Sequence, residues 1–285
     1  HRDLHSFPTR RSSDLGLKDT VRVLDEAGIC FFGVDEISQK IVDKENSLSL
    51  HGYCCYSTNP KGMIKGREDN SVINPLSYKK LRADLDKDKR EGYLSILSCH
   101  WGEEHVHYPN LIHISLARAL AKDFRFILHG NHPHVLQGID TLGESMVAYS
   151  LGNALFDNVY NEKSLDPLVE LSEANRATGI LEIDIKGNAI LASNFIPYIF
   201  NEQSIDFKNT LGIRKNMNEW SKSLSVDDNY IQIRNKLRNE YITNRRKKRN
   251  FQWYLSRLNI ETMKIVINGK RNYRSFKNLT SLDLK

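Results

Sequence analysis

The chain has 285 residues, of which 40% are hydrophobic and 27% are charged. This composition supports a sizeable core and excludes a globally disordered chain. The sequence holds no apolar run of the roughly 18–20 residues that a membrane-crossing helix requires. Its four cysteines lack C-x-x-C spacing, which argues against a disulfide framework and favours a reducing compartment.

The net charge of +6 is unevenly distributed along the chain. From Asn201 onward, 19 Lys and Arg residues stand against 8 Asp and Glu residues, a balance of +11. The preceding part of the chain holds 22 against 27, a balance of −5. The basic character therefore belongs to residues 201–285, which we expect to form a mainly helical extension.

The first fifteen residues, HRDLHSFPTRRSSDL, have no apolar period, no apolar h-region and no cleavage-like site, so they do not predict a signal peptide. They match, over their whole length, the translation of a common DNA sequencing-library adapter. We therefore interpret residues 1–15 as an adapter-derived artefact and expect the native gene to begin upstream of Gly16. The domain that carries the function is expected at 16–200.

Hydrophobic periodicity predicts four elements in the first part of the chain. The first is a helix at 16–28 capped by Asp19 or Thr20. It is followed by strands at 29–34 (ICFFGV) and 47–57 (SLSLHGYCCYS) and by a solvated helix at 75–90. Further along, two alternating segments meet at Lys186-Gly187-Asn188. They predict a β-hairpin over 177–200.

Three apolar runs each end in a polar corner: YLSILSCHWG at 93–102, FRFILHGNHPH at 124–134 and MVAYSLGNALFD at 146–157. A helix is expected between the first two, at 110–123. A strand–helix–strand order implies parallel neighbouring strands in a layered α/β fold. Ligands gather beyond the carboxyl ends of such strands, so we expect the three corners to converge on one site.

The second corner holds His132-Pro133-His134. Proline disfavours helical backbone in the preceding residue, so we expect His132 to be extended and both imidazoles to point to one face. With His100 from the first corner they could bind one metal ion. Isolated histidines more often cap strand ends, but three at adjacent strand ends favour metal. His129 is expected only to end its strand.

A second H-x-H, formed by His105 and His107, has no apolar strand to hold it. Both histidines are therefore expected on the surface.

The segments CHWGEEHVHYP, HGNHPHVLQG and AYSLGNALFD resemble, in this order and spacing, the CapA family of capsule and poly-γ-glutamate synthesis proteins. GLKDTVRVLDEAGICFFG is similar to a further family segment. The resemblance implies a layered sandwich like that of calcineurin-like metallophosphoesterases, incomplete at its N-terminus. It implies that His100, His132 and His134 are metal ligands. Glu104, Asn131 and Asn153 are expected to orient the ligands or to contact substrate, and no catalytic residue is identified.

The resemblance also implies two divalent ions, of Mn, Zn or Fe. The family's early Gly-Asp, Asn-x-Glu and Asn-Asn-His elements are absent, so the second metal site is expected to be incomplete and this chain inactive. His113 stands where Gln is usual, and Ala154 where Phe is usual. Both changes are expected to be tolerated.

The resemblance implies a metal-dependent hydrolase of capsule or exopolymer synthesis, acting on an anionic polymer or a phosphoester. The alternative is a non-catalytic assembly component. Capsule-synthesis membrane proteins are the expected partners, and localisation stays open. The run RRKKR at 245–249, followed by Phe251, Trp253 and Tyr254, is most simply a solvated helix face. A membrane surface is its favoured functional partner, and nucleic acid is not favoured.

Overall fold

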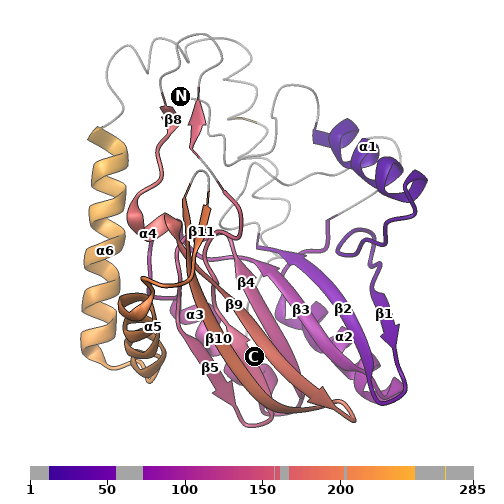
Figure 1. Cartoon of the computed structure of the whole chain (residues 1–285). Coiled ribbons are helices and arrows are strands. Elements are labelled where there is room, and N and C mark those ends of the chain that lie inside the picture. The colour runs from indigo at the N-terminus through magenta and orange to yellow at the C-terminus, as the bar shows by residue number, and fades with distance from the viewer. Residues whose placement is uncertain are drawn as a thin grey trace.

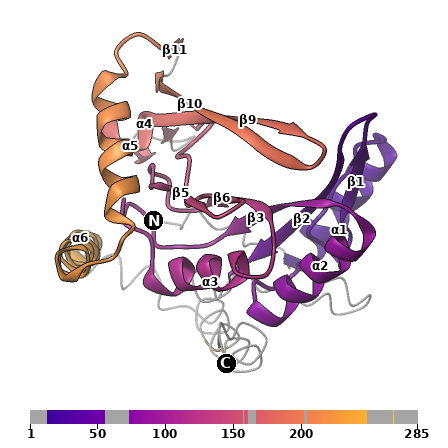
Figure 2. The same cartoon turned by 90° about the horizontal axis from the view of Figure 1, so that it is seen from below.

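The chain forms three layers in the computed structural model, which describes residues 13–55, 73–156, 158–160, 167–201, 204–247 and 267. Helices α2 (Tyr78–Glu91) and α3 (Leu111–Ala121) cover one face of a six-stranded sheet. A hairpin of β9 (Ala177–Lys186) and β10 (Ala189–Asn201) lies over the other face (Figures 1 and 2). The predicted layered α/β fold is confirmed.

The six-stranded sheet has the order β1-β2-β3-β4-β6-β5. Its strands are β1 (Gln39–Val42), β2 (Ser47–Cys54), β3 (Leu94–His100), β4 (Phe126–Asn131), β5 (Ile139–Leu142) and β6 (Ser145–Ala148). The four central strands run parallel, whereas β1 and β5 pair antiparallel at the two edges. The predicted succession of strand, helix and parallel strand is therefore confirmed by β3, α3 and β4.

The hairpin turns at Gly187 and Asn188, whose φ values are 57° and 61°. Two successive positive φ values are typical of a type I′ turn, so the turn predicted at these residues is confirmed. β10 also pairs with β11 (Ser204–Asp206). A separate ribbon joins β7 (Val159–Tyr160) to β8 (Pro167–Val169), and the short helix α4 (Glu173–Arg176) precedes β9.

The main core lies between the six-stranded sheet and its two covering helices. α2 begins after Ser77, whose hydroxyl accepts from the Lys80 amide, and ends at Gly92 with a φ of 80°. The side chains that fill this core are almost fully buried: Leu81, Leu85, Leu97, Ile114, Leu116, Phe126 and Leu128. This packing holds β3 and β4 in place, so that both strands end at the same edge of the sheet.

Two expectations near the N-terminus are wrong. α1 (Ser13–Glu26) begins before Asp19 and Thr20, so neither residue caps it. Residues 29–34 form no strand, and within the described chain they contribute a single bridge at Val34. Gly33, with a φ of 92°, crosses β2 so closely that an added Cβ would lie 3.1 Å from the Gly52 Cα. The chain turns there instead of pairing, despite an apolar composition typical of strands.

The expected helical character after residue 200 is confirmed over the described residues, which form α5 (Leu211–Ser223) and α6 (Asp228–Lys247) after β11. α6 includes the start of the basic run RRKKR. The rest of that run and the aromatic residues after it lie outside the described residues. No described helix is both long and apolar enough to cross a membrane.

A buried polar cluster ties α2 to three strands. The Asp88 carboxylate, only 1% exposed, accepts hydrogen bonds from Lys40 Nζ and Ser95 Oγ, each at 2.7 Å. It also shares a hydrogen bond of 2.6 Å with His51 Nε2. Burial opposes ionisation of Asp88, but the hydrogen bonds from His51, Lys40 and Ser95 outweigh it and lower the pKa of the carboxyl.

Replacing Asp88→Asn should lower the free energy of unfolding by about 2 kcal/mol, because the buried carboxylate loses its charge-assisted hydrogen bonds with Lys40, His51 and Ser95. Asp86→Asn, on the exposed side of the same helix, removes only the ion pair with Arg90 and should cost less than about 1 kcal/mol. Urea unfolding at neutral pH measures both. Because the pKa of Asp88 is lowered by folding, its contribution is present at neutral pH and is lost in acid. Equal losses in the two variants would contradict this account.

Candidate functional site

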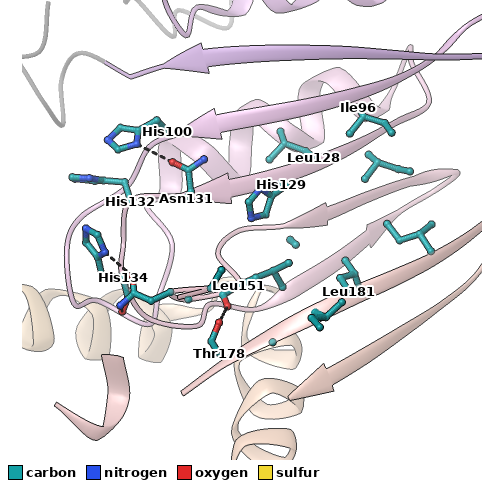
Figure 3. Close-up of a pocket in the computed structure, with 18 of the residues that line it drawn as sticks. Ile96, His100, Leu128, His129, Asn131, His132, His134, Leu151, Thr178 and Leu181 are labelled. Atoms are coloured by element: carbon teal, nitrogen blue, oxygen red, sulfur yellow. Dashed lines mark hydrogen bonds between the residues drawn. The ribbon is translucent and has the colours of Figure 1, made fainter. Parts of the chain in front are cut away.

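The histidines predicted as metal ligands lie at the carboxyl ends of two paired parallel strands. His100 ends β3, and its register partner Asn131 ends β4. His132, Pro133 and His134 follow directly after β4. Figure 3 shows the three imidazoles together at one end of a pocket. The structure therefore brings the first two polar corners together, as expected.

The three imidazoles are neighbours. The ring centroids of His100 and His132 are 4.5 Å apart, and those of His132 and His134 are 6.0 Å apart. Imidazoles that share one ion have centroids about 5 Å apart, given Zn–N bonds of about 2.0–2.1 Å. Across the described ranges, however, no three His, Cys, Asp or Glu side chains are grouped so as to hold a metal ion. The histidines fit the donor chemistry of a metal site but do not form a closed ligand set.

The backbone that carries these side chains differs from the prediction. The extended conformation expected for His132 is wrong, because its φ is 96°, and that of His134 is 57°. The chain reverses immediately after β4, and Pro133 packs on Gly102, where an added Cβ would lie 3.1 Å from the proline Cγ. This turn outweighs the local preference for extended backbone before proline. Non-glycine residues with positive φ are uncommon, and such strain concentrates at functional sites.

Two asparagine amides orient the imidazoles. Asn131 Oδ1 lies 2.8 Å from His100 Nδ1, and Asn153 Oδ1 lies 2.8 Å from His134 Nδ1 (Figure 3 draws both bonds). The Asn153 amide is itself oriented, because its Nδ2 donates to the Asn175 carbonyl at 3.1 Å. An amide oxygen only accepts, so Nδ1 carries a proton, and in the neutral imidazole Nε2 then keeps its lone pair. This is the tautomer in which a histidine binds metal through Nε2.

Asn153 belongs to the third polar corner, so all three corners meet at this site. Its neighbour Asn175 had no signal in the sequence. Asn175 Nδ2 donates to the His134 carbonyl at 2.8 Å and to His105 Nδ1 at 2.9 Å. Because Asn175 lies just before β9, it links the hairpin layer to the histidines.

The expectation that His105 and His107 lie on the surface is wrong. His105 is half-buried, and its ring stacks 6.3 Å from that of His134. His107 stacks on Trp220 with centroids 4.2 Å apart, and its Nδ1 donates to a backbone carbonyl at 2.8 Å. The H-x-H spacing of the pair was visible in the sequence, but the side chains that cover it come from distant segments. His105 therefore joins the site.

A close contact behind the histidines fixes their strands. The Trp101 Nε1–H donates to the Tyr149 carbonyl at 3.0 Å. A Cβ at Gly130 would overlap both of these groups, so only glycine allows the approach. On its other face the Trp101 ring stacks on His113, with centroids 4.6 Å apart. The glycine and tryptophan of the two motifs are therefore structural supports of the site.

The histidines form the polar end of a pocket of about 840 Å³ between the two sheets. The rest of its lining is largely apolar and includes Ile96 and Leu128 from the six-stranded sheet and Leu181 from β9 (Figure 3). His129 also lines the pocket, farther from its polar end, and lies inside β4 instead of ending it. Burial lowers the pKa of both His100 and His129, which favours the neutral form of both imidazoles. Neutral imidazole is the form that binds metal.

A family model described as bacterial capsule synthesis protein PGA_cap matches residues 12–158. The chain is 27% identical over 175 residues to the capsule biosynthesis protein CapA of Bacillus anthracis. The aligned region covers 59% of this chain and 43% of that protein. It is 26% identical over 173 residues to the PGA biosynthesis protein CapA of Bacillus subtilis (strain 168). This alignment covers 59% of this chain and 45% of that protein. The chain thus spans less than half the length of these curated relatives.

Two solved structures resemble the chain at low similarity. The sulfate thiohydrolase SoxB of Thermus thermophilus has a TM-score of 0.41 and 13% identity, covering 74% of this chain and 34% of that one. The NAD nucleotidase of Haemophilus influenzae has a TM-score of 0.36 and 16% identity, covering 80% and 43%. Likenesses this weak carry no functional argument.

His113, behind Trp101, should give the fold a measurable pH dependence. Burial, and secondarily Arg234, lowers the pKa of His113 to about 3, against about 6.5 for an unfolded histidine. Folding therefore resists protonation of this group, so stability is full above about pH 6.5 and falls as the pH drops towards 3. His113→Gln removes the titrating group. Below about pH 6 the wild type should lose about 1.4 kcal/mol per pH unit relative to the variant.

Urea unfolding of wild type and His113→Gln at about pH 7, 6 and 5 measures this difference. A difference that does not change with pH would contradict the assignment of His113 as a buried neutral imidazole.

Proposed function

Because the chain belongs to the bacterial capsule synthesis protein family PGA_cap, we propose that it functions in capsule or exopolymer biosynthesis through a metal-dependent, phosphoesterase-like hydrolase site. The observation that carries this proposal is the group formed by His100, His132 and His134. Two of these imidazoles have Nδ1 bonded to an asparagine oxygen, which leaves Nε2 as the ligating atom. The three histidines would hold a divalent ion such as Mn²⁺, Zn²⁺ or Fe²⁺.

A bound divalent ion supplies Lewis acidity, which lowers the pKa of a water and neutralises charge on a phosphoryl or similar oxyanion. The residues of this chain contribute binding and orientation. Asn131 and Asn153 hold their histidines in the ligating tautomer, and Glu104 and Asn153 are the candidates for contact with substrate. We assign no residue as general acid or base.

The proposed substrate is an anionic polymer or a phosphoester, because a cationic metal site attracts such groups. Three histidines make at most half of the two-metal set that the family resemblance implies. We therefore expect the 285-residue chain to hold one weakly bound ion and to hydrolyse little. Capsule-synthesis membrane proteins are the proposed partners, with the basic C-terminal segment at a membrane surface.

A second candidate function is a non-catalytic assembly component of the same machinery. It is favoured by one observation, that the described residues hold no closed set of three metal ligands. In that case the histidine group would serve structure alone. The two candidates differ in their activity: the hydrolase would lose hydrolysis when His132 is replaced, whereas the assembly component would hydrolyse nothing.

Metal binding tests the proposed site directly. Zn²⁺ titration of the full 285-residue chain by calorimetry should give saturable 1:1 binding. Asn153→Ala should weaken that binding about tenfold, because the His134 ring loses its orienting acceptor. His132→Ala should weaken it more, because a ligand is lost. His107→Gln changes a histidine outside the pocket and is the matched control, which should bind as wild type.

Equal Zn²⁺ binding by His132→Ala and wild type would contradict the metal assignment. The choice between hydrolase and assembly component needs a form as long as the curated relatives, assayed with Mn²⁺ on a phosphodiester and on γ-linked glutamate polymer. Hydrolysis abolished by His132→Ala supports the hydrolase. Capsule formation that persists in the His132→Ala strain supports the assembly component.

A further inference from the structure

Helix α6 presents one face to the loop that carries Glu104 and His105. Tyr230, Arg234, Arg238 and Tyr241 recur at intervals of three or four residues, which places them on one side of a helix. All four contact residues 103–109, the loop that follows β3. α6 lies outside residues 12–158, the part of the chain that matches the family. The contact is therefore between the family domain and the C-terminal segment of this chain.

The first half of this face anchors the far end of the loop. The Tyr230 hydroxyl donates to the Pro109 carbonyl at 2.7 Å, and Arg234 Nε donates to the same oxygen at 3.1 Å. Arg234 also forms an ion pair with Glu103, and Arg238 Nε lies 3.5 Å from the same carboxylate. Both Tyr230 and Arg234 are buried, so these bonds are shielded from water. The helix is firmly docked at this end.

Tyr241, three residues beyond Arg238, reaches the histidine site itself. Its hydroxyl donates to the Glu104 carboxylate, and its ring centroid lies 5.2 Å from that of His105. His105 in turn stacks on His134. The His105 amide also donates to the Pro133 carbonyl at 2.8 Å. An unbroken series of contacts therefore runs from α6 to the His-Pro-His segment.

The two adjacent carboxylates are held in different surroundings. Glu103 is paired with Arg234 and Arg238, whereas Glu104 accepts a hydrogen bond from the Tyr241 hydroxyl. Glu103 and Glu104 are therefore both held by α6, each through a different side chain.

We propose that α6 is part of the histidine site and that Tyr241 is a positioning residue, which orients Glu104 and holds His105 against His134. The C-terminal segment then completes the site instead of being a separate appendage. His105 has a φ of 60°, a backbone conformation that persists only when its surroundings enforce it. The side chain of His105 contacts both Tyr241 and Asn175. Two measurements test this proposal, hydrogen exchange at His105 and metal affinity. Only the metal-affinity measurement rests on the proposed function.

Tyr241→Phe removes the hydroxyl and keeps the ring, so it tests the bond to Glu104 alone. The amide of His105 is the reporter, because its hydrogen bond to Pro133 joins the loop to the His-Pro-His segment. Hydrogen exchange of this amide in the full chain, followed by NMR, should be about tenfold faster in the variant. Tyr230→Phe is the matched control. It removes a hydroxyl from the same helix face without touching Glu104, and should leave exchange at His105 as in wild type.

Zn²⁺ affinity is the second readout, and it should fall about threefold to tenfold in Tyr241→Phe and stay unchanged in Tyr230→Phe. If Tyr241 only helped to dock α6, as Tyr230 does, the two variants would change Zn²⁺ affinity and exchange at His105 alike, and this split would be absent. Unchanged exchange at His105 in Tyr241→Phe, or equal acceleration in both variants, would overturn the proposal. If the wild-type chain binds no Zn²⁺, the proposed metal function fails, and the exchange of His105 still decides the role of Tyr241.

Discussion

The site depends on the parallel pairing of β3 with β4, which sets His100 opposite Asn131 at the end of both strands. A shift of this pairing by one residue would turn His100 to the opposite face of the sheet. The register is held behind the histidines, where Trp101 approaches the Tyr149 carbonyl across Gly130. The position of the histidines therefore depends on the close packing of Trp101, Tyr149 and Gly130, which lie behind the site.

Much of this arrangement could be predicted from the sequence, because apolar runs that end in histidine and asparagine are local signals. The backbone of His132 could not, since its positive φ depends on a turn that packs Pro133 on Gly102. His105 and Asn175 were missed for the same reason, as their partners come from segments far away in the sequence. Local rules give the strand ends, and long-range packing decides which polar side chains join them.

The pocket between the two sheets has a polar end and an apolar remainder. One end of the pocket is built of imidazoles and amides, and the remainder runs between the two sheets along apolar side chains (Figure 3). The family-matched part supplies the three histidines and the amides of Asn131 and Asn153. The helices α4 and α6 add Asn175 and Tyr241 from outside it. The site is thus a family core that later elements of the chain enclose and orient.

The proposed metal site depends on the amides of Asn131 and Asn153, which hold His100 and His134 in the tautomer that carries its lone pair on Nε2. Long-range ¹H–¹⁵N correlation spectra of the histidine rings, recorded on the metal-free full chain at neutral pH, report the tautomer of each imidazole directly. We expect a protonated Nδ1 and an unprotonated Nε2 in both rings. A protonated Nε2 in either ring would contradict this expectation, because the lone pair that the proposed metal ion requires would then be absent.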